Sequence, residues 1–364
     1  APEDASQTAA EPSSEAVSAA PEYHANAKAA LLIDLNTGRT IFEQNADEQV
    51  YPASLTKIMT CLLALENGNL SDVVTITDEA YADLVSGSST ADLQVGEQLR
   101  LEDLLYCMMV ESGNEAANAV AEHIGGTIED FVNMMNERAY ELCCTHTHFM
   151  NPHGLHNESH YTTARDMALI AREAMQDETF RKIASTTTYA LPRTNMHGSR
   201  RLDSKMAELF GSDSAVYPAA NGIKTGYTSK AGYCFVGSAT KNGVTFISVV
   251  FNCGSYAKCW SDTKKLMEYG FTQYVSTSVA ELYAMSPKVL EISNKIVQEN
   301  HLTTLMITHN MRDAIRYGNR LIMMNEGHVI YDVRGEEKTK LEVSDLLQRF
   351  EQAGGEANDR MILS

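Results

Sequence analysis

A serine and a lysine one helical turn apart are the residues of this chain best suited to chemistry. Ser54 and Lys57 follow Pro52, and apolar residues then recur at helical spacing up to Gly68. Ser54 and Lys57 therefore share one face at a predicted helix start. A lysine in a desolvated site near another cation can lose its proton and then accept the proton of a serine hydroxyl. The spacing predicts a nucleophilic serine with a lysine base.

A Ser-x-x-Lys pair alone is a weak signal, but two further motifs follow this pair along the chain. The pair occurs again at Ser255 and at Ser261 without such company. Downstream of Ser54 come Ser-Gly-Asn at 112–114 and Lys-Thr-Gly at 224–226. Their order and spacing resemble the motif set of serine penicillin-binding proteins and β-lactamases.

From about Ala27 to about Phe271 the sequence resembles the low-molecular-mass penicillin-binding D-alanyl-D-alanine carboxypeptidases of bacteria, the peptidase S11 family. The resemblance implies a two-step acyl transfer in which Ser54 attacks the bond between two terminal D-alanines of a cell-wall pentapeptide. Lys57 would act as the base, and water would release the acyl-enzyme. β-Lactams would trap Ser54, and no cofactor or metal is implied.

The same resemblance assigns roles to the other motif residues. Ser112 would pass a proton to the leaving amine, and Asn114 would hold the substrate amide and Lys57. Lys224 and Thr225 would bind the terminal carboxylate with a cation and a hydroxyl, and Gly226 would let a peptide lie alongside the strand. The backbone N–H of Tyr227 would form an oxyanion hole with that of Ser54.

One position departs from the family pattern. Members often carry an arginine just before the closing helix to grip the terminal carboxylate, and Cys259 stands there. Lys258 is a candidate replacement, although an ammonium lacks the bidentate fork of a guanidinium. Two alternatives stay open: a β-lactamase-like serine hydrolase, for which a Glu-x-x-Leu-Asn segment is missing, and a non-hydrolytic penicillin-binding sensor.

The elements that must position these motifs can be read from periodicity and turn residues. Strands are expected in a hairpin from Ala29 to Phe42 and in a meander of 222–228, 233–240 and 244–251. Helices are expected at 101–110, 115–123, 127–143, 163–174 and 260–269, a surface loop is expected at 76–96, and residues 186–213 form a polar segment. The fold class is therefore α+β, and the resemblance implies a five-stranded antiparallel sheet of β-lactamase/transpeptidase type with an inserted helical lobe.

Two residue types suggest sites that the spacing does not support. Seven cysteines lack Cys-x-x-Cys pairing, so we expect mostly small buried hydrophobic residues. A histidine-rich stretch lacks carboxylate or cysteine ligands at a recognisable spacing, so we expect a surface loop and no metal, at His146, His148, His153, His156 and His160.

Composition bounds the remaining functions. The 364 residues carry a formal charge of −19, which disfavours nucleic acid as a partner. Residues 1–22 are rich in Ala, Ser, Glu and Pro and are expected to form a disordered leader. They begin without Met, which is consistent with a secreted or cell-envelope protein whose signal peptide has been removed. The carboxypeptidase domain is expected to span residues 23–284.

Residues 287–364 change in character and resemble the C-terminal end of an ABC transporter ATP-binding subunit. We expect a helix to Glu299, a strand from Thr303 to Thr308, a helix from Met311 to Tyr317, a hairpin at 320–334 and a final helix near 343–350. His309 stands where that family has its switch histidine, and we expect it to be inert here. No Gly-x-x-x-x-Gly-Lys-Ser/Thr loop is present, so no nucleotide is expected as a partner.

Overall fold

A computed structural model of the chain describes residues 23–207, 217–273, 311–325 and 328–353. The chain divides into two compact units, Ala1–Val275 and Ser276–Ser364. Among the described residues no helix is long and apolar enough to cross a membrane.

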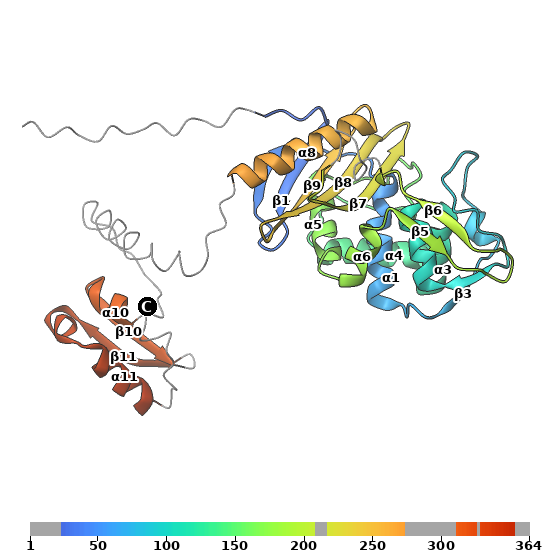
Figure 1. The fold of residues 1–364 in the computed structure, drawn as a ribbon. Coiled ribbons are helices and arrows are strands. Elements are labelled where there is room, and N and C mark those ends of the chain that lie inside the picture. Colours follow the sequence, from blue (N-terminus) through green and yellow to red (C-terminus); the bar gives the residue numbers. More distant parts are fainter. Residues whose placement is uncertain (1–22, 208–216, 274–310, 326–327, 354–364) are drawn as a thin grey trace, which may run out of the picture. The chain divides into compact units, whose positions relative to one another are not determined.

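A five-stranded antiparallel sheet forms the centre of the first unit, as the sequence predicts (Figure 1). Its strands are β1 (Ala29–Asp34), β2 (Thr40–Gln44), β7 (Ala220–Thr228), β8 (Gly232–Lys241) and β9 (Val244–Phe251), in the order β2-β1-β9-β8-β7. Asn242 and Gly243, with φ of 53° and 77°, supply the left-handed turn that a tight β8–β9 hairpin requires.

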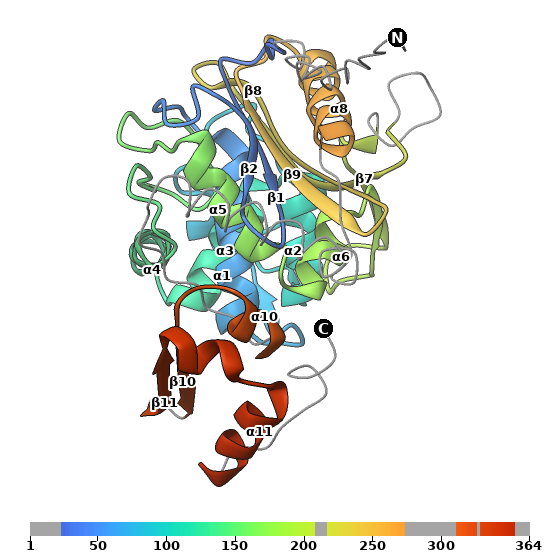
Figure 2. The same ribbon diagram turned by 90° about the vertical axis from the view of Figure 1, so that its left-hand side faces the viewer.

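Each face of the sheet is covered by helices, which explains why β1 is buried throughout its length. Helix α8 (Tyr256–Gln273) packs on one face, where Leu32, Phe246 and Trp260 share a core (Figure 2). Leu31 and Ile247 point to the other face, toward the helical lobe. Successive residues of β1 and β9 thus alternate between two cores, as the period of two in a strand dictates.

The helical lobe is inserted between β2 and β7 in the sequence. Predicted helices are confirmed as α2 (Leu101–Val110), α3 (Asn114–Gly125), α4 (Ile128–Glu141) and α5 (Ala164–Ala174). The reactive helix begins with a 3₁₀ turn, η1 (Ala53–Thr56), and continues as α1 (Lys57–Asn67).

Several short elements of the lobe were missing from the sequence prediction. They are η2 (Glu79–Tyr81), α6 (Glu178–Ala184) and two small hairpins, β3 (Val73–Thr75) with β4 (Gln98–Arg100), and β5 (Thr188–Leu191) with β6 (Arg200–Asp203). The polar segment 186–213, for which no element was predicted from the sequence, therefore contains a hairpin. Strands of three or four residues are too short to show a period of two.

The second unit contains α10 (Met311–Arg316), β10 (Arg320–Asn325), β11 (His328–Arg334), η3 (Gly335–Lys340) and α11 (Val343–Gln352). The predicted helix, hairpin and final helix are confirmed. Met311, Leu321, Val333 and Leu346 form a small core. The predicted helix to Glu299, strand 303–308 and His309 lie outside the described residues.

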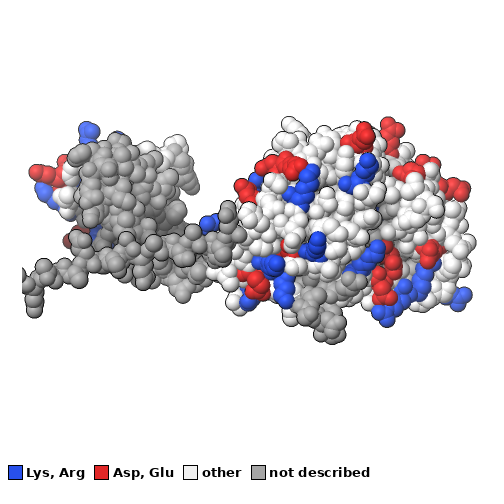
Figure 3. Space-filling model, turned by 90° about the horizontal axis from the view of Figure 1, so that it is seen from above, with Lys and Arg blue, Asp and Glu red and all other residues white. Residues whose placement is uncertain are grey.

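Basic and acidic side chains of the first unit lie interspersed on the face drawn in Figure 3. In the first unit as a whole, charged side chains form ion pairs, as Arg138 does with Glu66 at 2.7 Å and Arg200 with the buried Glu97 at 2.8 Å. The strongly negative net charge is therefore not gathered in one patch on this face.

Candidate active site

The reactive serine lies in a strained turn at the start of α1. Ala53 has φ of 49°, a left-handed value that is uncommon for a residue with a side chain. The 3₁₀ turn η1 then places Ser54 one turn before Lys57, and the Lys57 Nζ lies 3.1 Å from the Ser54 Oγ. The predicted pair is thus brought together.

Lys57 is fully buried, and its amine has three polar neighbours. Besides Ser54, these are the Asn114 Oδ1 and the His153 carbonyl oxygen, each 2.7 Å from Nζ. Both oxygens can only accept hydrogen bonds, so they take both N–H bonds of a neutral amine. The remaining lone pair then faces the Ser54 hydroxyl. This arrangement suits a base aimed at the nucleophile.

The electrostatic surroundings favour the neutral form of that base. Burial lowers the pKa of Lys57 well below its ordinary value, and the positive charge of Lys224 lowers it further. The carboxylate of Glu115 acts in the opposite direction as a smaller contribution. Desolvation therefore dominates, as expected for an amine enclosed by protein.

Ser112 and Asn114 enter the site from the connection between α2 and α3. Ser112 has φ of 62°, and its Oγ accepts a hydrogen bond from the Lys224 Nζ at 3.0 Å. The backbone N–H of Asn114 donates to the Ser89 carbonyl at 2.9 Å, which fixes the start of α3. The two lysines thus each contact one residue of this motif.

Strand β7 lies at one end of the sheet order and passes alongside the reactive turn. A Cβ placed on Gly226 would lie 3.1 Å from the Pro52 carbonyl oxygen and 3.2 Å from the Ser54 nitrogen. Only a glycine allows this close approach without displacement. Lys224 and Thr225 are buried, whereas the Tyr227 side chain is 49% exposed. The structure therefore brings Gly226 against the turn that carries Ser54, and Lys224 reaches Ser112 from the same strand.

A buried carboxylate next to the second motif was missed by the sequence analysis. The Glu115 Oε1 accepts hydrogen bonds from the backbone N–H groups of Ala91 at 2.5 Å and Leu93 at 3.4 Å. Its Oε2 is buried without a hydrogen-bond partner, and burial raises the pKa of the group. Ala91 and Leu93 are buried too. Glu115 thus ties the 76–96 loop, predicted to lie on the surface, to the catalytic motif.

The prediction of a histidine-rich surface loop is wrong for His153 and His160, which are both buried. The Leu155 N–H donates to the His153 Nδ1, so the ring proton of His153 is on Nε2. That Nε2–H donates to the Asp83 Oδ2 at 2.9 Å. His146 and His156 are exposed as expected. Among the described residues no cluster of His, Cys, Asp and Glu is arranged to hold a metal ion.

His160 links the same loop to the reactive turn. The Met150 N–H donates to the His160 Nδ1, and the His160 Nε2–H donates to the Thr56 Oγ1 at 2.9 Å. Thr56 in turn donates to the Ala53 carbonyl. Burial lowers the pKa of His160 to about 3, so the ring stays neutral and keeps this tautomer. Segment 150–160 therefore supports the turn that carries Ser54.

Gly154 shows how closely that segment packs. Its φ is 93°, and an added Cβ would lie 1.8 Å from the Ala53 carbonyl oxygen. We expect Gly154→Ala to destabilise the first unit by about 3–5 kcal/mol, because both the backbone conformation and the contact resist a side chain. Thermal unfolding would measure this. Gly198→Ala, where nothing lies within 4 Å, is the matched control and should change stability by less than about 0.5 kcal/mol. Equal transition temperatures for the two variants would contradict this packing.

The cysteines follow the prediction, since all except Cys143 are buried and all seven are free. The Cys259 Sγ donates to the Tyr233 carbonyl at 3.5 Å. Its small thiol therefore faces the protein interior in the position where an arginine was expected.

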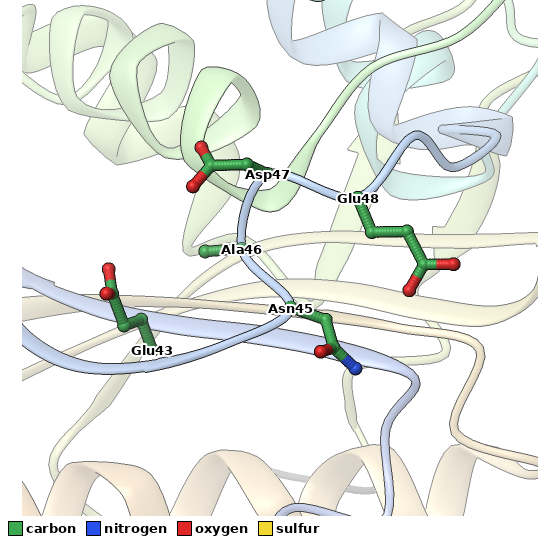
Figure 4. A pocket seen from close by; sticks show the side chains of 5 residues that line it. All are labelled: Glu43, Asn45, Ala46, Asp47 and Glu48. Carbon is green, nitrogen blue, oxygen red and sulfur yellow. The ribbon is translucent and has the colours of Figure 1, made fainter.

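A surface hollow of about 510 Å³ lies apart from these groups (Figure 4). Two of its carboxylates, Glu43 and Asp47, are paired with Arg165 at 2.8 and 2.7 Å, and Glu48 is paired with Lys28 at 2.6 Å. None of the predicted site residues lines it, and each of its three carboxylates already has a cationic partner. We therefore assign the chemistry to the Ser54 site.

A serine hydroxyl faced by a buried lysine, beside the end strand of an antiparallel sheet with an inserted helical lobe, defines a serine enzyme of the DD-peptidase class. The crystal structure of the Streptomyces K15 DD-transpeptidase has this fold, with 33% identity and a TM-score of 0.63 over 69% of this chain and 98% of that one. Penicillin-binding protein 5 of Haemophilus influenzae is similar, with 34% identity and a TM-score of 0.62 over 69% of this chain and 72% of that one.

The sequence comparisons agree with the structural ones. The model of the peptidase S11 family, D-alanyl-D-alanine carboxypeptidase, matches residues 14–255. The carboxypeptidase DacF of Bacillus subtilis is 33% identical over 90% of this chain and 80% of its own length. DacA of Escherichia coli is 35% identical over 68% of this chain, which spans only 61% of that relative. The chain belongs to the peptidase S11 family.

The second unit has no comparable assignment. The match to the Bacillus subtilis protein covers 90% of this chain and therefore includes residues beyond Val275, where the first unit ends. None of these matches relates the second unit to ABC transporter ATP-binding proteins. That resemblance stays a prediction.

Proposed function

We propose that the chain is a serine D-alanyl-D-alanine carboxypeptidase that removes the terminal D-alanine of peptidoglycan pentapeptides through an acyl-enzyme on Ser54. The observation that carries the proposal is the environment of Lys57. Its buried amine has two acceptor-only neighbours at 2.7 Å, which leaves one position directed at the Ser54 Oγ. Membership of the S11 family supports the substrate class.

The first step forms the acyl-enzyme. As the Ser54 Oγ attacks the carbonyl carbon between the two D-alanines, its proton passes to the Lys57 Nζ. The charge that Lys57 gains is stabilised by the Asn114 Oδ1 and the His153 carbonyl oxygen. The backbone N–H groups of Ser54 and Tyr227 hold the developing oxyanion, since β7 runs beside the reactive turn.

The second half of the reaction expels D-alanine and then hydrolyses the ester. Ser112 passes a proton to the leaving amine, and the Lys224 ammonium 3.0 Å from its Oγ makes that hydroxyl a better donor. Ser112 regains a proton from Lys57, which is then neutral again. A water molecule attacks the acyl carbon as its proton passes to Lys57, and Lys57 returns a proton to the Ser54 Oγ when the ester C–O bond breaks. Hydrolysis regenerates Ser54, and the two products are D-alanine and the shortened peptide.

Release of D-alanine from an acylated peptide ending in D-alanyl-D-alanine tests the proposed function. We expect turnover with this peptide and none with the matched peptide ending in L-alanyl-L-alanine. Absence of D-alanine release, with a penicillin bound covalently, would favour the non-hydrolytic sensor instead. Fast hydrolysis of penicillin without peptide turnover would favour a β-lactamase.

The pKa shifts predict how activity depends on pH. Burial, followed by the nearby charge of Lys205, lowers the pKa of Lys224 to about 7. Lys224 is cationic below that pH and neutral above it, so attraction for a substrate carboxylate weakens as pH rises through about 7. Lys57 must be neutral, so the acid limb of kcat/KM follows its lowered pKa.

We expect a bell-shaped profile of kcat/KM whose alkaline limb belongs to Lys224. A Lys224→Arg variant keeps its charge at every pH used, so its alkaline limb should move upward even where its maximum is lower. Steady-state kinetics between about pH 5 and pH 10 would show this. An alkaline limb at the same pH in both proteins would refute the assignment to Lys224.

The remaining partners and the location follow from the same proposal. β-Lactams acylate Ser54 because their amide occupies the position of the scissile bond. The enzyme works outside the cytoplasm, where its peptidoglycan substrate lies. The second unit binds no nucleotide, since the chain has no phosphate-binding loop. Calorimetric titration with Mg-ATP would test that absence.

A further inference from the structure

The terminal carboxylate of the substrate lacks the cation that the family pattern led us to expect. Cys259 stands in its position, and the thiol is buried against the Tyr233 carbonyl oxygen. Lys258 is no clear substitute, because its Nζ lies against its own loop, 3.7 Å from the position of a Cβ on Gly254. A second cation must therefore come from elsewhere if the site holds a carboxylate as tightly as the family pattern implies.

Lys205 projects from a turn that is anchored on both sides. Ser204 is buried and its N–H donates to the Thr187 carbonyl at 2.8 Å. Met206 is buried in the core between α8 and the sheet, and its N–H donates to the Ser204 Oγ. The Lys205 side chain between them is exposed. The backbone is thus fixed while the ammonium reaches outward.

Several contacts place that ammonium beside the third motif. The Lys205 Nζ lies 5.9 Å from the centroid of the Tyr256 ring. The Tyr256 ring contacts that of Tyr233, which in turn packs against Tyr227 directly after the third motif, with ring centroids 4.8 and 4.5 Å apart, and Thr225 is near enough to affect the pKa of Tyr256. Lys205 is also the charged group whose repulsion lowers the pKa of Lys224. Two ammonium groups therefore lie near Thr225, one buried and one at the surface.

The Tyr256 ring gives Lys205 a fixed platform. It stacks on Trp260 with ring centroids 5.5 Å apart and meets the Tyr233 ring edge-on at 4.8 Å. An ammonium near an aromatic face is weakly attracted to it and loses less freedom on binding an anion. No carboxylate within the described ranges forms an ion pair with Lys205, whose side chain is exposed.

We propose that Lys205 binds the C-terminal carboxylate of the substrate together with Lys224 and Thr225, in place of the arginine expected at position 259. This inference rests on the proposed function and names the residue that makes the site selective for peptides with a free C-terminus. A bound carboxylate also relieves the repulsion between the two ammonium groups. An anion bound between the two ammonium groups is therefore held more tightly than an anion bound to Lys205 or to Lys224 alone.

The test compares two peptides that differ only at the C-terminus, the free acid and the carboxamide of the same acylated D-alanyl-D-alanine peptide. We expect Lys205→Ala to lower kcat/KM for the acid about five- to tenfold, chiefly through KM, and to leave the amide unchanged. Lys205→Arg should retain at least half of the wild-type value. Lys265→Ala, which removes an exposed lysine from α8, is the control for charge and should behave as wild type.

Binding of both peptides to a Ser54→Ala background gives the same comparison without turnover. Loss of the preference for the acid in the Ser54→Ala, Lys205→Ala double variant supports the role of Lys205. A wild type that releases no D-alanine would count against the proposed function and would leave this binding result unaffected. A Lys205→Ala variant that matches Lys265→Ala overturns the proposal. The proposal is also overturned if Lys258→Ala loses the preference for the free acid over the carboxamide and Lys205→Ala keeps it.

Discussion

Replacing Ser54 by alanine lowers the rate of D-alanine release by at least about 10⁴-fold, because among the described residues Ser54 carries the hydroxyl that Lys57 contacts. The Ser54 Oγ is the hydroxyl toward which the free position of Lys57 is directed, and Gly226 admits β7 beside it. D-Alanine release, followed with a coupled D-amino-acid oxidase assay, measures the effect.

The chain supplies its own control for that variant. Ser261 lies three residues before Lys264, so it repeats the spacing of Ser54 and Lys57 on α8, away from the second and third motifs. Ser261→Ala should retain wild-type activity. A Ser54→Ala variant that folds and keeps more than about one hundredth of the wild-type rate would show that a different group is the nucleophile.

Replacing Lys57 by methionine lowers the rate of acylation by about 10²–10⁴-fold while leaving the fold intact. Methionine has a similar length and no polar end, so it keeps the packing of a fully buried side chain. It cannot take the Ser54 proton. It also leaves the Asn114 Oδ1 and the His153 carbonyl without their donor, which costs about 1–3 kcal/mol for each unpaired acceptor.

Stopped-flow measurement of acylation by a chromogenic β-lactam separates the chemical step from substrate binding. Lys264→Met, the corresponding change in the repeated motif, should acylate at the wild-type rate. Should Lys57→Met acylate within tenfold of wild type, general base catalysis by Lys57 would be excluded and Ser112 or a water molecule would have to take its place.

The parts of the site that the sequence predicted are those carried by side chains in recognisable motifs. Ser54, Ser112 and Lys224 lie far apart along the chain, yet their order was enough to expect them together. The sheet was also predictable, since alternating apolar residues and the Asn242–Gly243 turn mark its strands.

The parts that were missed act through the backbone or through burial. The carbonyl of His153 holds Lys57, and any residue could supply a carbonyl, so no side-chain pattern marks that contact. His160 was expected in a surface loop because polar residues and glycine surround it, yet it is buried against Thr56. Glu115 gave no signal beyond its place directly after the second motif.

The position of Cys259 illustrates a different limit. The sequence showed that an arginine was missing, but it could not show which cation lies near Thr225 in its place. Lys205 precedes the third motif by nineteen positions, and only the packing of its turn against the core beneath α8 brings it toward Tyr256. Spacing along the chain carries no information about that contact.

Intact-mass spectrometry after incubation with a penicillin, followed by peptide mapping, tests the central claim most directly. The result expected is one adduct of the mass of the intact antibiotic, located on the peptide that contains Ser54 and absent from the Ser54→Ala variant. An adduct on another residue, or an adduct that persists in Ser54→Ala, would contradict the assignment of Ser54 as the nucleophile.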